Sequence, residues 1–132
     1  MWYLETASSA DRQRSYEKNL VNAGSPGLVP AEMIEQWADW VRTKDDDYKV
    51  VDIDLYCEPV FTRSEQAAIL RFHDEWNEAA DATPDPMPWT VEELIDTPVW
   101  SRFGEAAART LEVFKRRGEL LDRAKFDANV KG

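Results

Sequence analysis

Six carboxylates crowd into the middle of the chain, at Asp45, Asp46, Asp47, Asp52, Asp54 and Glu58. Carboxylates at this density can hold a divalent cation, meet a basic surface on another molecule, or remain solvated. The spacing matches no calcium loop, because the glycine of the sharp turn and the distal glutamate are both missing. We therefore expect no metal site and no cofactor. Recognition of a basic surface is favoured over a solvated face because the acidic excess is confined to one segment.

A second pattern in the same region has the residue types of a metal-dependent nuclease site. Asp47-Tyr48-Lys49 fits the acid-x-lysine portion of such a site. A nuclease also needs a further acid on a neighbouring strand and basic residues that grip the phosphodiester backbone. The net charge of −10 opposes that grip, so the nuclease interpretation is set aside.

His73 and Cys57 are the only histidine and the only cysteine of the chain. A general base needs a partner that orients it, and Asp74 and Glu75 fall on other faces of the helix predicted around His73. We interpret His73 as a boundary residue of the apolar face and Cys57 as a small buried hydrophobe. No nucleophile, metal or phosphate-cradling motif accompanies them, so the sequence predicts a protein that is not an enzyme.

The formal charge is polarised along the chain. Residues 45–99 contain 15 acids and three bases, residues 1–44 contain six acids and five bases, and residues 100–132 contain five acids and eight bases. The middle segment should attract basic surfaces, and the chain as a whole should repel polyanions. We expect a basic protein surface as the partner, such as that of a nucleic-acid-binding protein, and no direct binding of nucleic acid.

The elements that position these groups are predicted to be mainly helical. Apolar residues recur at spacings of three and four in five segments, which gives a bundle of four to five helices. The segments are 8–24, 30–42, 62–80, a short helix after Thr90 that Thr97 and Pro98 close, and 98–126. The pattern places five aromatic residues in the core, namely Trp37, Phe72, Trp76, Phe103 and Phe114, and also turns Tyr16, Leu20, Val21 and Trp40 inward.

Local signals mark the ends of these helices. Thr62 and Glu65 form a capping box, and so do Thr90 and Glu93, with Trp89 and Leu94 as a hydrophobic staple. Gly24 suits the left-handed position after a helix, and Pro30 suits the first turn of one. In the final helix, glutamates precede arginines by four residues at 105/109, 112/116 and 119/123, an order that favours ion pairs.

One segment departs from the helical pattern. In residues 50–57, Val51, Ile53, Leu55 and Cys57 alternate with polar or aromatic residues, which is typical of a half-buried strand. Residues 2–4 are the only candidate partner, so an optional two-stranded β element of residues 2–4 and 50–56 is left open, with a short helix as the alternative.

Length and composition predict a single helical domain over residues 1–132. The chain is 43% hydrophobic, enough for a packed core. It has no apolar run that could span a membrane and no signal-peptide pattern, which together with one cysteine predicts a cytoplasmic protein.

These observations lead to two function hypotheses. The first is a non-enzymatic acidic binding protein: an inhibitor or immunity-type factor that mimics nucleic acid and covers a basic, nucleic-acid-gripping surface of its partner. The alternative is a structural or assembly protein that forms a homodimer through its long C-terminal helix. The sequence names neither the partner nor the pathway.

Overall fold

A computed structural model describes residues 2–25, 28–44, 48–58, 60–84 and 86–131, with side chains as far as Arg116. The architecture is mainly helical, as predicted: the described residues contain helices and one isolated β-bridge, but no strand. In chain order the helices are α1 (Trp2–Ala7), α2 (Ala10–Asn22), α3 (Val29–Trp40), the 3-10 helix η1 (Ile53–Tyr56), α4 (Arg63–Ala82), α5 (Glu92–Ile95) and α6 (Pro98–Lys131).

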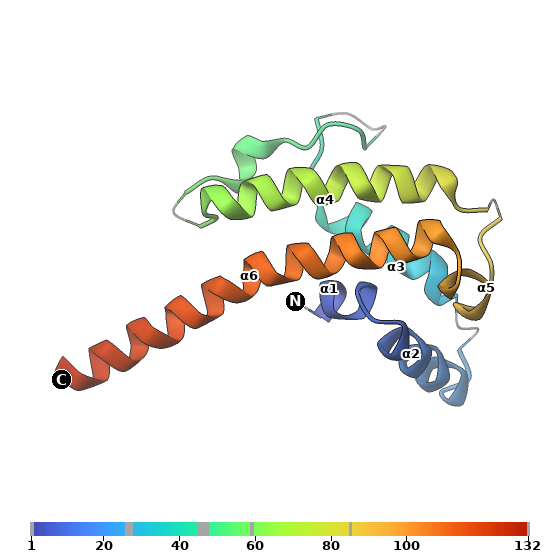
Figure 1. The fold of residues 1–132 in the computed structure, drawn as a ribbon, viewed down its shortest axis with the longest axis horizontal. Helices are drawn as coiled ribbons and strands as arrows, with labels where there is room; N and C mark the ends of the chain where they lie inside the picture. Colours follow the sequence, from blue (N-terminus) through green and yellow to red (C-terminus); the bar gives the residue numbers. More distant parts are fainter. Residues whose placement is uncertain (1, 26–27, 45–47, 59, 85, 132) are drawn as a thin grey trace.

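Helices α4 and α6 form the centre of the bundle. They run side by side in opposite directions, and α1 and α3 pack against them (Figure 1). The predicted core residues Trp37, Phe72, Trp76 and Phe103 are all buried. Phe114 is only partly buried and packs against the edge of the core. Val21 and Trp40 were predicted to point inward, but each is about half exposed.

Helix ends largely follow the predicted signals. The capping box of α4 is formed, with Glu65 N donating to Thr62 Oγ1 and Thr62 N donating to Glu65 Oε1. Gly24 has a φ of +82° just after α2, and a proline occupies the first turn of α3. The N-cap of α2 is Ser9, one residue later than predicted, and its hydroxyl accepts from Arg12 N.

The predicted cap of α5 is wrong. Thr90 bonds the side chain of Glu93 and accepts no backbone amide, while Trp89 is 64% exposed and cannot act as a staple. Instead, the carboxylate of Glu17 on α2 accepts from Val91 N at 3.0 Å. An anion supplied by another helix therefore occupies the place of the local cap, which is favourable because the start of a helix exposes unpaired N–H groups.

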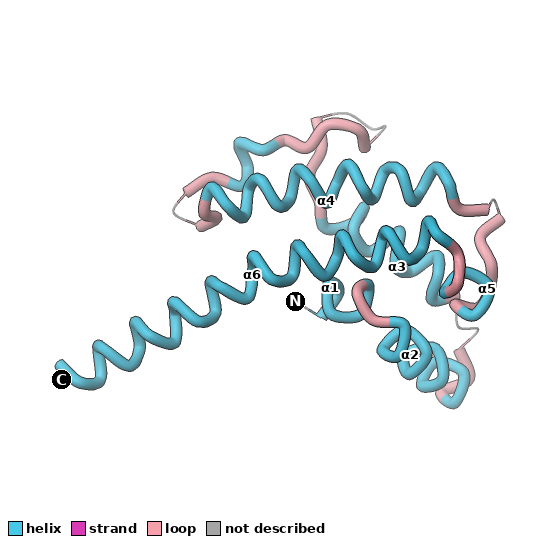
Figure 2. The backbone as a smooth tube through the Cα atoms, in the orientation of Figure 1, coloured by secondary structure: helices cyan, strands magenta, loops and turns pink. Residues whose placement is uncertain are grey.

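The optional β element is not formed. Residues 2–4 belong to α1, residues 53–56 form η1, and the one bridge joins Thr43 to Val51 (Figure 2). Helix α1 is held by tertiary contacts: Leu4 and Ala7 are buried, and the Tyr3 hydroxyl donates to the carbonyl of Met33 on α3. A six-residue helix has too few internal hydrogen bonds to be stable alone, so packing decides its conformation.

A buried amide joins three helices. Gln13 Nε2 on α2 donates to the carbonyls of Thr6 and Ala7 at the end of α1, each at 3.1 Å. Gln13 Oε1 accepts from the indole of Trp100 on α6 at 2.9 Å. The group is 2% exposed yet satisfied at both ends, as a buried polar group must be.

Candidate functional site

The acidic segment, residues 45–58, is part of a loop that turns back on itself between α3 and α4. Asp52 N donates to Arg42 O at 2.9 Å, and Lys44 N donates to Val50 O at 2.8 Å. These two bonds flank the Thr43–Val51 bridge and bring the two arms of the loop together. Asp45, Asp46 and Asp47 fall between the two arms in the sequence and lie outside the described residues.

Two buried side chains fix the returning arm to the bundle. Val51 is 5% exposed and Tyr56 is 6% exposed. The Tyr56 hydroxyl accepts from Arg42 N at 2.8 Å, and its carbonyl accepts from Gln66 Nε2 on α4 at 2.6 Å. The returning arm that contains Asp52 and Asp54 is therefore tied to α4 and to Arg42, just after the end of α3.

His73 of α4 fixes the loop at a further point, the carbonyl of Tyr48. It is 1% exposed, so the boundary position predicted for it is wrong. His73 Nδ1 lies 3.0 Å from the indole Nε1 of Trp37, and His73 Nε2 lies 2.5 Å from the carbonyl oxygen of Tyr48. An indole nitrogen can only donate and a carbonyl can only accept, so Nδ1 is the acceptor and Nε2 carries the proton. The ring is thus a neutral bridge between α3 and the loop.

Burial lowers the pKa of His73, against a smaller opposite effect of the hydrogen bond to Tyr48. Protonation of His73 would place a hydrogen on Nδ1, so that two N–H groups, this one and the indole N–H of Trp37, would face each other. The same contact holds Tyr48 at a φ of +59°, unusual for a bulky residue, with its ring edge-on to Trp76. Because both ring nitrogens are engaged, His73 acts as a structural tie rather than a free base.

The described acids of the segment are solvent-facing. Asp54 and Glu58 are exposed, and Asp52 is half-buried. The strand interpretation of residues 50–57 would place Asp52 and Asp54 on one face, but residues 53–56 form η1, so this placement is wrong. Within the described ranges, no group of three or more histidine, cysteine or acidic side chains is arranged to hold a metal ion. Cys57 is exposed, which corrects its predicted burial.

Exposed apolar side chains gather in and beside the acidic segment, a feature missed in the sequence. Among the described residues, nine large hydrophobic side chains are exposed, and four of them belong to residues 48–60. They are Tyr48, Val50, Leu55 and Val60, at 42%, 50%, 59% and 64%. The strand interpretation had placed Leu55 on the buried face. A surface that only keeps the protein solvated does not require exposed apolar side chains beside its acids.

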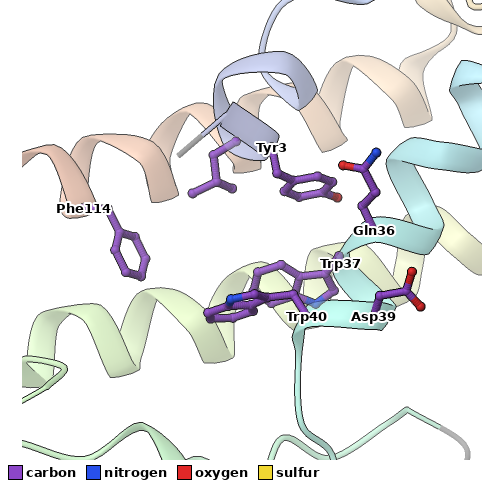
Figure 3. Close-up of a pocket in the computed structure, with 7 residues that line it drawn as sticks. Tyr3, Gln36, Trp37, Asp39, Trp40 and Phe114 are labelled. Atoms are coloured by element: carbon purple, nitrogen blue, oxygen red, sulfur yellow. The ribbon is translucent and has the colours of Figure 1, made fainter.

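An apolar cavity of about 450 Å³ opens beside this segment. Tyr3 of α1 faces Trp37 and Trp40 of α3 across the opening, with Phe114 at one end and Gln36 and Asp39 at the other (Figure 3). Leu4 of α1 also lines the cavity. Burial raises the pKa of the Tyr3 hydroxyl, which is therefore neutral and donates to Met33 O. Trp40 also packs on Tyr56, with ring centroids 5.3 Å apart, so the cavity and the acidic segment share a wall.

Two findings complete the description. No helix in the described part of the chain is both long and apolar enough to cross a membrane. No protein-family model matches the sequence, and neither the curated proteins nor the solved structures include a significant match. The function must therefore be argued from the surface itself.

Proposed function

We propose that this protein is a non-enzymatic acidic binding protein that covers a basic surface of a partner protein, with residues 45–58 as the contact segment. The observation that carries the proposal is the coincidence of acids with exposed apolar side chains on one anchored loop. Carboxylates attract and orient a basic partner, while apolar groups contribute the energy of desolvation at the centre of the contact. In this protein Asp54 and Glu58 alternate with Leu55 and Val60.

The anchoring of the loop supports the same function. A binding loop that is already ordered loses less conformational entropy on association. The bonds of Tyr56 and of the Tyr48 carbonyl hold the described part of the loop to α4 and to Arg42, and Trp40 of α3 packs on the Tyr56 ring. We infer that the partner meets a preformed surface, and that its site is one that otherwise grips nucleic acid, in the manner of an inhibitor or immunity factor. The proposed setting is the cytoplasm.

Affinity capture with matched baits tests this proposal. The wild-type protein is compared with a contact variant, Asp45, Asp46, Asp52 and Asp54 changed to Asn, and with a control variant, in which the exposed acids Asp74, Asp81, Asp96 and Glu105 become amides. Both variants move the net charge from −10 to −6, so only the position of the lost charge differs. A basic protein captured by the wild type and the control but not by the contact variant supports the proposal. Equal capture by all three contradicts it.

A second candidate function is self-association through α6. Helix α6 continues to Lys131, and its distal half projects beyond the rest of the bundle (Figure 1). Long helices commonly mediate assembly by packing against a copy of themselves. A dimer that persists at high salt and is lost on deletion of residues 117–132 would favour this candidate; a monomer at all concentrations would exclude it.

A further inference from the structure

The apolar cavity beside the acidic segment has the chemistry of a cation site. Its walls present the aromatic rings of Tyr3, Trp37, Trp40 and Phe114, and its one formally charged lining residue is the acid Asp39. Aromatic rings carry negative charge on their faces and attract a cation held within about 6 Å of the ring centre. Because none of the described residues that line the cavity is basic, they offer an anion no charged partner.

The size and openness of the site favour a side chain with both a charge and an apolar stem. About 450 Å³ is within the range of about 300–1,000 Å³ that is usual for ligand clefts. Trp40 is 46% exposed although it packs on Trp37 with ring centroids 5.1 Å apart, so its indole is held in place and still accessible. Arginine suits such a ring better than lysine, because its planar guanidinium stacks on aromatic faces and is more weakly hydrated.

The cavity also belongs to the surface assigned above to a basic partner. Trp40 contacts Tyr56, the residue that fixes the acidic segment to α3 and α4. A basic surface that meets Asp54 and Glu58 is therefore adjacent to the cavity, and residues 1–114 as a whole contain 23 acids and ten bases, a net charge of −13. Aromatic residues and arginine are the side chains most enriched at the energetic centres of interfaces.

We propose that the cavity lined by Tyr3, Trp37, Trp40 and Phe114 receives an arginine side chain of the basic partner. This inference rests on the proposed function and specifies how the partner is recognised. The guanidinium stacks on the indole of Trp40 with the ring of Phe114 beside it, and its aliphatic stem lies against Leu4. The acidic segment supplies long-range attraction, and the cavity supplies selectivity for arginine over lysine.

The test uses two fluorescently labelled peptides of equal length and charge, one with arginine at every second position and one with lysine there. Binding is measured by anisotropy at low salt for the wild type, Trp40→Leu, Trp40→Phe and Trp89→Ala. Trp89 is exposed and does not line the cavity, so its variant is the matched control. Phe114→Leu, which keeps the apolar volume at the far end of the cavity, is the second variant should Trp40→Leu fail to fold.

We expect the wild type and Trp89→Ala to bind the arginine peptide at least about 2-fold more tightly than the lysine peptide. The preference should stay below the roughly 30-fold of a whole cation–π contact, because lysine makes a weaker contact of the same kind. Trp40→Leu should lose this preference, Trp40→Phe should keep most of it, and Phe114→Leu should reduce it. Equal affinity of the wild type for both peptides, or a preference that survives Trp40→Leu, would overturn the inference.

The outcomes separate the cavity from the acidic segment. If the wild type binds both peptides equally and Asp52→Asn with Asp54→Asn weakens both, the proposed function stands and the arginine site falls. If the arginine preference persists while those two substitutions change neither affinity, the site stands and the role of the acidic segment falls. Failure to bind either peptide at low salt contradicts both.

Discussion

Removing the polar atoms of His73 tests whether one buried ring holds the acidic loop to the bundle. In His73→Leu the side chain remains apolar and of similar reach, but the indole N–H of Trp37 loses its acceptor and the carbonyl of Tyr48 loses its donor. Trp37 is 4% exposed, so water cannot easily replace the lost acceptor. The carbonyl of Tyr48 belongs to an exposed residue and is more readily hydrated.

The expected cost follows from these two bonds. A buried donor left without a partner costs about 1–3 kcal/mol, and the more accessible carbonyl adds about 0.5–1.5 kcal/mol. We therefore expect His73→Leu to lower the free energy of unfolding by about 2–4 kcal/mol. Urea denaturation followed by tryptophan fluorescence measures it as a lower midpoint.

Two conservative variants test the two hydrogen bonds of His73 separately. His73→Asn places an amide oxygen near the position of Nδ1 and should restore part of the bond to Trp37, while His73→Gln places an amide N–H near Nε2 and should restore part of the bond to Tyr48. Each should be more stable than His73→Leu. A loss below about 0.5 kcal/mol in His73→Leu, or equal stability of all three variants, would refute the hydrogen-bond argument.

The pH dependence of the free energy of unfolding gives an independent test of the state of His73. Because the pKa of His73 is lowered by folding, the unfolded chain binds the proton first as the pH falls. Stability should be unaffected by this group above its ordinary pKa of about 6.5 and should fall below it, by at most about 1.4 kcal/mol per pH unit for one proton. Carboxylates also titrate there, so the quantity to measure is the wild-type profile minus that of His73→Asn. If the stability of the wild type minus that of His73→Asn rises on acidification, the lowered pKa of His73 is contradicted.

Five further substitutions test the packing, the caps and the buried amide. Phe72→Ala should lower the free energy of unfolding by about 3–5 kcal/mol because its ring is fully buried. Phe114→Ala at the cavity edge should lower it clearly less, because Phe114 is only partly buried. Equal losses of stability in urea denaturation would show that the position of Phe114 is wrong. Thr62→Ala should lower the free energy of unfolding by about 0.5–2 kcal/mol, and Thr90→Ala by less than about 0.5 kcal/mol. Of these two threonines, only Thr62 caps a helix through its hydroxyl. A lower melting midpoint for Thr90→Ala than for Thr62→Ala would refute this. Gln13→Leu should cost about 2–4 kcal/mol, since it leaves two carbonyls and an indole without their partner; an unchanged midpoint would show that water replaces the amide.

The sequence was most informative where local chemistry decides the conformation. The capping box at Thr62, the left-handed Gly24 and the proline of α3 need only neighbouring residues to be recognised, and all three are present. The core position of Phe72 follows equally directly from a periodic apolar face that is 20 residues long in α4.

Predictions were wrong where distant residues compete with local ones. The carboxylate of Glu17 replaces the expected cap at Thr90, and residues 2–4 form a helix because the rest of the bundle covers it. The alternation around Ile53 had no neighbouring strand to pair with, so η1 formed and Tyr56 was buried instead. A period of two indicates a strand only where a partner exists.

The candidate site was predicted in part. Charge alone indicated residues 45–58, and the structure adds the exposed apolar groups and the anchors that charge cannot reveal. The role of His73 depends on Trp37 and Tyr48, which are 36 and 25 residues away along the chain. The exposure of Leu55 was not predicted, because the alternation of residues 50–57 assigned that side chain to the interior.

The association rate with the captured partner tests the central claim most directly. Measured by stopped flow at low and high salt, the wild type and the control variant with four acids neutralised elsewhere should associate rapidly at low salt and slow steeply as salt is added. The contact variant, with Asp45, Asp46, Asp52 and Asp54 changed to Asn, should associate more slowly at low salt, and the difference should shrink at high salt. Identical rates for the contact and control variants at low salt would contradict the claim that residues 45–58 meet the partner.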